Sequence, residues 1–234
     1  MEQAEKDEDG AADRKVVMPH KGGNTTLYML AAVAVVAVVI IAAFATGILS
    51  TGSKDSVTLT GAGATFPMPL ILKWADEYYN VSEGAVKVNY GGGGSGAGIT
   101  QIKEKQVDFA GSDAPLSAAD SSTYGLVHIP ETLGAVVVAF NLPGISTLKL
   151  DGDTTARIFM KNITAWDDPA IAAQNPGVTL PDESIATVVR SDSSGTTFVF
   201  TGYLAIVSQE FDELYGQGKT VAWPEGTLAQ SGNS

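Results

Sequence analysis

The feature that most constrains this chain is an uninterrupted apolar run from Leu27 to Leu49 that contains no charged residue. At a helical rise of about 1.5 Å per residue, such a run is long enough to cross a bilayer core of roughly 30 Å. It separates a polar tail, residues 1–26, from everything that is available to build a globular core. We therefore predict a disordered cytoplasmic tail over residues 1–26 and a single transmembrane anchor over residues 27–49.

The distribution of basic residues predicts the orientation of this segment. Arg14, Lys15 and Lys21 stand in the tail before the run, and Lys54 follows it. By the positive-inside rule the N-terminus is then cytoplasmic, and everything after residue 50 lies outside the cytoplasm. Residues 50–56 are expected to be a short linker.

A cleaved signal peptide is the alternative interpretation of the same segment. Ala43-Phe44-Ala45 resembles a signal-peptidase site, and cleavage after Ala45 would release a secreted protein. The length of the apolar run and of the tail before it favours the uncleaved, single-pass anchor. Both interpretations place the remaining chain on the extracytoplasmic side of the cell membrane.

Composition excludes several classes of partner and chemistry. The net charge of −12 argues against nucleic acid, and it means that any anion site must depend on local donors. The chain has no cysteine, which excludes disulfides, thiolate metal sites and cysteine nucleophiles. Apart from His20 in the tail, only His128 is available to a folded site, so we expect neither a metal centre nor a cofactor.

From residue 57 onward, segments with strand and helix patterns alternate, which predicts an α/β fold. The expected strands are Val57–Thr60, Val86–Tyr90, Val107–Ala110, Ala135–Phe140 and Ile185–Val189, and the expected helices are Phe66–Tyr79, Gly98–Lys105, Thr154–Phe159 and Thr196–Val207. The apolar run Ala135–Phe140 reads as a strand buried on both faces. In the first helix Leu70, Trp74 and Tyr78 recur every four residues and are expected to face the core.

Three glycine-rich or hydroxyl-bearing turns, residues 61–66, 91–96 and 193–197, directly precede predicted helices. Helix N-termini expose free N–H groups with partial positive charge, and Ser or Thr adds a hydroxyl donor. One such turn is ordinary helix capping, but three suggest a cage of donors around an oxyanion. The second turn also matches a dinucleotide fingerprint weakly, whereas a lysine-bearing phosphate loop is excluded because no lysine follows the glycines.

Charged residues lie next to two of these features. Arg190 ends a predicted strand, so that its guanidinium can hold two anion oxygens, and Asp192 is close enough to fix that guanidinium by hydrogen bonding. Asp113 follows the strand that contains Asp108, and either acid is also compatible with a turn or cap role.

Together these segments resemble the phosphate-binding proteins of bacterial and archaeal phosphate ABC transporters. The matching pieces are LTGAGATFPMPLILKWADEYY, VKVNYGGGGSGAGITQIKEKQVDFAGSDAPLS, IPETLGAVVVAFNLPGI, ITAWDDPAIAAQNPGVTLP and VVRSDSSGTTFVFTGYL, in family order from Leu59 to about Trp223. The resemblance implies the two-lobed type II periplasmic binding-protein fold, with a first lobe over residues 57–130 and a second over residues 131–234. It also implies that the chain is truncated at its C-terminus, inside the second lobe.

The resemblance further implies which residues bind phosphate. The implied ligands are Thr65, Phe66, Ser95, Asp113, Arg190, Ser194, Gly195 and Thr196, with Asp192, Gly94 and Gly96 in supporting positions. Phe66 and Gly195 would donate backbone N–H groups and the Ser and Thr residues hydroxyls. Asp113 would accept a hydrogen bond from the proton of phosphate, which sulfate lacks at neutral pH, and would thereby reject sulfate.

The function implied is capture of inorganic phosphate outside the cytoplasm and delivery to the permease subunits of an ABC importer. A phosphate sensor or a binding protein for another oxyanion is the alternative. A phosphohydrolase is less well supported, because the sequence offers neither a metal cluster nor a histidine–nucleophile pair. The chain is therefore not expected to be an enzyme.

Overall fold

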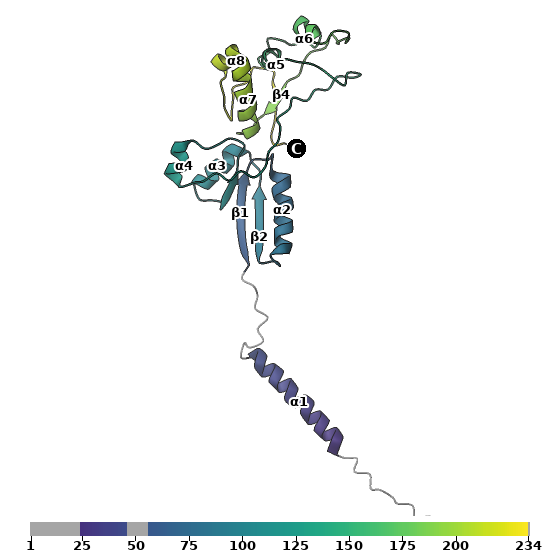
Figure 1. The fold of residues 1–234 in the computed structure, drawn as a ribbon, viewed down its shortest axis with the longest axis vertical. Helices are drawn as coiled ribbons and strands as arrows, with labels where there is room; N and C mark the ends of the chain where they lie inside the picture. Colours follow the sequence, from purple (N-terminus) through teal and green to yellow (C-terminus); the bar gives the residue numbers. More distant parts are fainter. Residues whose placement is uncertain (1–23, 46–55, 234) are drawn as a thin grey trace, which may run out of the picture. The chain divides into compact units, whose positions relative to one another are not determined.

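The computed structural model describes residues 24–45 and 56–233 (Figure 1). The chain divides into two compact units, Met1–Ser53 and Lys54–Ser234, which are considered separately. The predicted tail, the linker and residues 46–49 of the predicted anchor lie outside the described residues, apart from Asn24 to Thr26 and Ser56.

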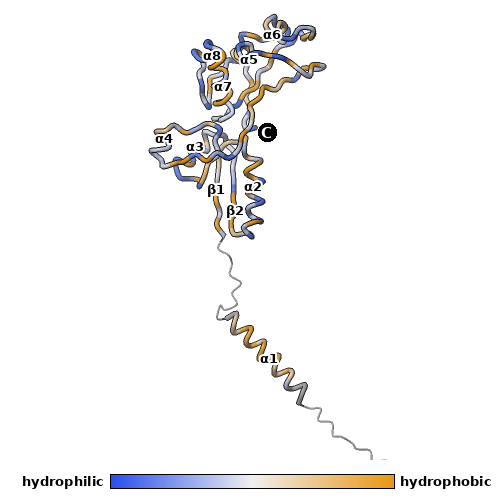
Figure 2. Tube along the Cα trace, viewed as in Figure 1, coloured by the Kyte–Doolittle hydropathy of each residue, from blue (hydrophilic) through white to orange (hydrophobic). Residues whose placement is uncertain are grey.

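The first unit contains helix α1, Asn24–Ala45, which covers most of the uncharged run and is coloured as hydrophobic over most of its length (Figure 2). Within residues 24–45 and 56–233, however, no helix combines the length and apolar character of a membrane span. The predicted transmembrane anchor at Leu27–Leu49 therefore has no support in the part of the chain that the structure describes.

A parallel three-stranded sheet begins the second unit and agrees with the predicted α/β class. Strands β1 (Val57–Gly63), β2 (Val86–Gly91) and β3 (Phe109–Gly111) are arranged in the order β2-β1-β3. Helix α2 (Met68–Val81) connects β1 to β2, and α3 (Ser95–Lys103) connects β2 to β3. The chain thus passes from β1 to β2 on one side of β1 and then crosses to β3 on the other side. Ligands of open α/β sheets bind at such a switch point, beyond the carboxyl ends of the strands.

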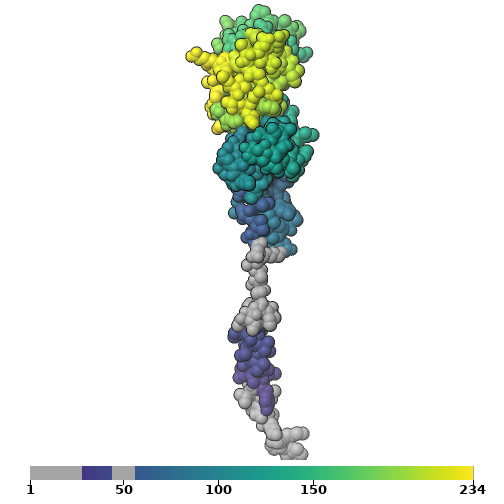
Figure 3. All heavy atoms as spheres, turned by 90° about the vertical axis from the view of Figure 1, so that its left-hand side faces the viewer, coloured from purple at the N-terminus to yellow at the C-terminus, as the bar shows by residue number. Residues whose placement is uncertain are grey.

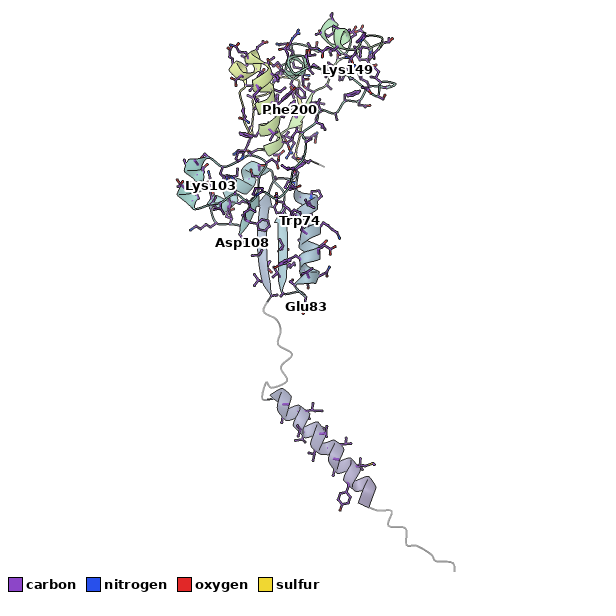
Figure 4. All side chains as sticks on the ribbon, viewed as in Figure 1. Trp74, Glu83, Lys103, Asp108, Lys149 and Phe200 are labelled. Carbon is purple, nitrogen blue, oxygen red and sulfur yellow. The ribbon has the colours of Figure 1, made fainter. Side chains whose placement is uncertain are left out.

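The predicted core row of α2 is wrong in part, because the helix is covered on one side only. Ile71 is buried, whereas 45% of Trp74 and 52% of Tyr78 is exposed. Both aromatic side chains border an apolar hollow of about 240 Å³, whose other walls include Val88 and Phe109 of the sheet (Figure 4 labels Trp74). Four-residue periodicity identifies the apolar stripe of a helix, but the exposure of that stripe depends on what packs over it.

The predicted strand Ala135–Phe140 is also wrong. The segment belongs to no strand, and 77% of Val137 is exposed. Before it, helix α4 (Ala118–Tyr124) begins at the Ser117 cap, whose Oγ accepts the Asp120 N–H at 3.0 Å. An apolar run indicates that side chains favour burial, but a strand also needs a neighbouring strand for its backbone hydrogen bonds.

The residues after Phe140 form a second group of helices and one pair of strands. Its elements are α5 (Gly152–Phe159), α6 (Pro169–Gln174), β4 (Val188–Arg190), α7 (Gly195–Val207), α8 (Gln209–Leu214) and β5 (Leu228–Gln230). A buried cluster of Ala156, Met160, Leu204 and Phe211 packs against aromatic rings that include Phe200 (Figure 4). Strands β4 and β5 are parallel, with Arg190 opposite Gln230. This pairing brings the segment after β5 alongside the residues that follow β4.

Candidate functional site

The site is built where the N-termini of α3 and α7 meet. The Gly96 N–H at the start of α3 donates a hydrogen bond of 2.9 Å to the carbonyl of Ser193, just before α7. A side-chain carbon at Gly96 would lie 2.0 Å from Ser193 Oγ, so only glycine permits this approach. In Figure 3 the yellow atoms, which belong to residues toward the C-terminus, adjoin the teal atoms of the part of the chain that includes α3 and α4. Two helix termini with free N–H groups and partial positive charge are thereby held together.

The side chains of Ser95 and Asp113 both lie against Gly195. A carbon added at Gly195 would lie 2.3 Å from Ser95 Oγ and 2.7 Å from Asp113 Oδ2. Ser95 is fully buried, and its Oγ accepts the backbone N–H of Asp113 at 3.1 Å. That bond leaves the hydroxyl proton of Ser95 available for another acceptor.

Arg190 and Asp192 form a bidentate ion pair in which the exposed fractions of the side chains are 13% and 17%. Arg190 Nε donates to Asp192 Oδ1 at 2.7 Å, and Nη2 donates to Oδ2. The predicted contact between the two residues is therefore present. Hydrogen bonding from Arg190, with a smaller contribution from its charge, lowers the pKa of Asp192. Gly94, with φ of 88°, lies so close to Asp192 Oδ2 that an added carbon would be 2.5 Å away.

Thr65 also contacts the guanidinium of Arg190. Arg190 Nη2 donates to Thr65 Oγ1 at 3.4 Å, although the two residues are far apart in the sequence. Phe66 follows in the chain. The residue is 39% exposed and its ring contacts Gly134, so only its backbone N–H is suited to the site. The turn after β1 is thus joined to the turn after β4.

The two remaining predicted ligands belong to the first turn of α7. Ser194 is the N-cap, and its Oγ accepts the Thr197 N–H at 3.2 Å. Thr196 borders a cavity of about 300 Å³ that Arg190 also borders. The structure therefore brings Thr65, Ser95, Asp113, Arg190, Ser194 and Gly195 together, with Gly94, Gly96 and Asp192 behind them and with Phe66 and Thr196 alongside.

The acidic groups beside the site are perturbed by burial and by one another. Burial raises the pKa of the Asp113 carboxyl, and the positive charge of Arg190 opposes that rise. Burial and the charge of Asp113 raise the pKa of Glu131. Burial, assisted by the charges of Glu131 and Asp113, raises the pKa of the Tyr90 phenol, which donates to the Ala64 carbonyl at 2.9 Å. Sequence reasoning missed Glu131, because no pattern in the segment 128–134 marks it.

Asp108, the other acid considered from the sequence, has a structural position. Its Oδ2 accepts the Thr60 N–H at 2.7 Å and so joins the start of β3 to β1 (Figure 4). Among residues 24–45 and 56–233, no group of three or more carboxylate or imidazole side chains is arranged to hold a metal ion. The site therefore offers hydroxyl and amide donors, one guanidinium and one carboxylate acceptor.

A sheet whose carboxyl-end turns face a second set of helix N-termini is the architecture of an α/β ligand-binding protein. Residues 49–234 match the family described as "PBP superfamily domain", and the chain belongs to that superfamily.

Several curated relatives are similar over most of this chain. The phosphate-binding protein PstS of Pasteurella multocida is 46% identical over 185 residues, which cover 78% of this chain and 52% of the relative. PstS of Methanocaldococcus jannaschii is 40% identical over 189 residues, covering 75% and 47% respectively. The chain thus spans about half the length of the curated relatives that it matches.

A solved structure supports the fold. It is the substrate-binding protein assigned to a phosphate ABC transporter of Clostridium perfringens, with bound phosphate. The TM-score is 0.51 at 16% identity, over 75% of this chain and 63% of that one. At this identity the similarity concerns the fold alone.

The ion pair at the site generates a prediction about stability. The pKa of Asp192 is lowered in the folded state. The stability that its ionised carboxylate contributes to the fold should therefore be complete above its ordinary pKa of 3.8, and should be lost as the pH falls through the lowered value. We expect Asp192→Asn to reduce the free energy of unfolding by about 1–3 kcal/mol at neutral pH, and by progressively less in acid. Urea unfolding across pH measures this difference, with the exposed Asp167→Asn as the control. A difference that does not change with pH would contradict this role of the ion pair.

Proposed function

We propose that this chain captures inorganic phosphate outside the cytoplasm and delivers it to the permease subunits of an ABC importer. The observation that carries the proposal is the convergence of donors on one point from two facing helix N-termini and from Arg190. Such donors suit a tetrahedral oxyanion, since each oxygen accepts hydrogen bonds from a different direction. The identity to the PstS proteins of two distant organisms supports phosphate as that anion.

In this proposal each predicted ligand has one task. Arg190 supplies the positive charge, and Asp192 holds its guanidinium in position through the bidentate pair. The hydroxyl donors are Thr65, Ser95, Ser194 and Thr196, and the backbone donors are Phe66 and Gly195. Gly94 and Gly96 permit the close contact of the two turns.

Capture without chemistry fits this set of groups better than catalysis does. Phosphoester hydrolysis needs a metal ion, a nucleophile with its base, or a general acid beside the leaving group. The groups assigned to the site provide donors and one acceptor. In the two-lobed fold proposed here, with lobes at residues 57–130 and 131–234, phosphate would be enclosed by hinge closure, and the closed form would dock on the permease.

Substitution of Arg190 tests the site directly. Arg190→Lys keeps the charge but loses the bidentate fork, so one or two charge-assisted hydrogen bonds should be lost. We expect phosphate to bind about 10- to 100-fold more weakly, which corresponds to roughly 1.5–3 kcal/mol. Isothermal titration of the full chain with phosphate measures the change, and Lys87→Arg on the sheet is the matched control. Absence of binding by the unsubstituted chain would refute the proposed function.

Asp113 is proposed to select phosphate over sulfate. Phosphate carries a proton that it donates to the carboxylate, whereas fully ionised sulfate is repelled and leaves the carboxylate without a donor. We expect Asp113→Asn to reduce the preference for phosphate by about 10- to 100-fold in competition titrations, since an unpaired buried charge costs roughly 1–3 kcal/mol. The exposed Asp76→Asn on α2 is the control. Unchanged preference in Asp113→Asn would remove this role.

The same carboxyl gives the preference a dependence on pH. Because burial raises the pKa of Asp113, the group takes up a proton at higher pH than an ordinary aspartate. As the pH falls through that raised pKa, the carboxyl becomes a donor and sulfate should compete better. In Asp113→Asn the preference should be low at every pH, so a parallel acid loss in both proteins would point to another group.

The alternative functions are sensing of phosphate and binding of a different oxyanion. Both would use the same donors, and titration with arsenate, sulfate and molybdate in parallel with phosphate separates an oxyanion of another kind from phosphate.

We also propose that residues 27–49 tether the protein to the cell membrane as a single pass, with the binding region outside. This part of the proposal depends on the uncharged apolar run alone. Alkaline carbonate extraction of membranes from cells that express the full chain should leave the protein in the pellet. A shortened, released protein that begins after Ala45 would support the cleaved signal peptide instead.

A further inference from the structure

A residue outside the predicted ligand set reaches the site from the segment after β5. Arg190 and Gln230 are opposite each other in the parallel pair β4–β5, and the Ser191 N–H donates to the Gln230 carbonyl at 2.9 Å. The chain after β5 therefore runs alongside the residues that follow β4. The Gly232 N–H continues this approach and donates to Asp192 Oδ1 at 3.4 Å. Asn233 is thereby placed beside the ion pair.

The side-chain oxygen of Asn233 is where two of the proposed phosphate donors converge. Thr65 Oγ1 donates to Asn233 Oδ1 at 2.8 Å, and Arg190 Nη1 donates to the same oxygen. The orientation of the amide follows from chemistry, because a guanidinium has only donors and must face the oxygen. One neutral oxygen therefore occupies the point at which Thr65 and Arg190 would hold an oxygen of the anion.

We propose that Asn233 is a displaceable internal ligand, whose amide oxygen takes the place of a phosphate oxygen until phosphate arrives. This inference rests on the proposed function of the same site. In the ligand-free protein the contact satisfies Thr65 and Arg190, which would otherwise lack this acceptor. Phosphate replaces it because a charged oxygen accepts stronger hydrogen bonds than a neutral amide does.

Displacement has a consequence for affinity and selectivity. A ligand that binds only when Asn233 has moved away has an apparent Kd equal to its intrinsic Kd divided by the fraction of protein in which Asn233 has left the site. Anions that accept hydrogen bonds weakly displace the amide less readily than phosphate does. Asn233 thus acts as a specificity-determining residue, and its effect is opposite to that of a direct ligand, whose removal weakens binding.

Titration of Asn233 variants in the full chain tests the proposal. Asn233→Ala removes the competitor, and we expect phosphate to bind about 3- to 10-fold more tightly, the change that corresponds to one net hydrogen bond. Asn233→Asp should bind phosphate at least about 10-fold more weakly, because its carboxylate pairs with Arg190 and repels the anion. Ser231→Ala, an exposed neighbour in the same segment, should leave the Kd unchanged. Equal or weaker binding by Asn233→Ala would overturn the proposal.

A second measurement needs no phosphate. Modification of Arg190 by phenylglyoxal in the ligand-free chain, followed by peptide mass spectrometry, should be faster in Asn233→Ala than in the unsubstituted protein and in Ser231→Ala. An unchanged rate would overturn the internal contact. If the unsubstituted chain binds no phosphate but the rate still rises, the proposed function fails and the occupation of Arg190 by Asn233 is supported.

Discussion

The contact between the N-termini of α3 and α7 is the constraint on which the rest of the site depends. The Gly96 N–H and the Ser193 carbonyl join the two turns, and Gly195 fits against Ser95 and Asp113 with no space for a side chain. Small residues are needed there because a single added carbon would separate the turns. Two helix termini that carry the same partial charge repel each other, so an acceptor between them, such as an anion, stabilises their approach.

Two charged groups flank this contact, and the proposed selectivity depends on them. Asp192 satisfies one side of the Arg190 guanidinium and leaves its Nη1 directed elsewhere. Asp113 is an acceptor among donors, and burial makes its ionised form costly. An anion that carries a proton would pair with Arg190 and also donate a hydrogen bond to Asp113. A fully ionised anion would pair with Arg190 alone and leave the Asp113 carboxylate without a donor. In the proposed function, the chemistry of the site would therefore distinguish between anions of the same shape, without any contribution from the net charge of the protein, which is −12.

Sequence reasoning succeeded where the signal is local. The strands Val57–Gly63 and Val86–Gly91 and the helix Gly195–Val207 agree with their predicted ranges within a few residues, since periodicity and turn residues act over short distances. It failed for Ala135–Phe140, where strand formation requires a partner, and for Trp74, whose burial requires a covering element. The short elements α4, α6, α8 and β5 were missed, because a few residues carry little periodic signal.

By itself, the sequence determined which residues carry donors and that these residues stand at the starts of helices, because capping and glycine turns are properties of neighbouring residues. Only the tertiary structure decided that the turns at residues 65, 95 and 195 meet, that Arg190 contacts Thr65, and that Asn233 reaches the same donors. The physical reason is that contacts between distant residues depend on strand order and register. The order β2-β1-β3 and the pairing of Arg190 with Gln230 are set by the packing of the whole unit.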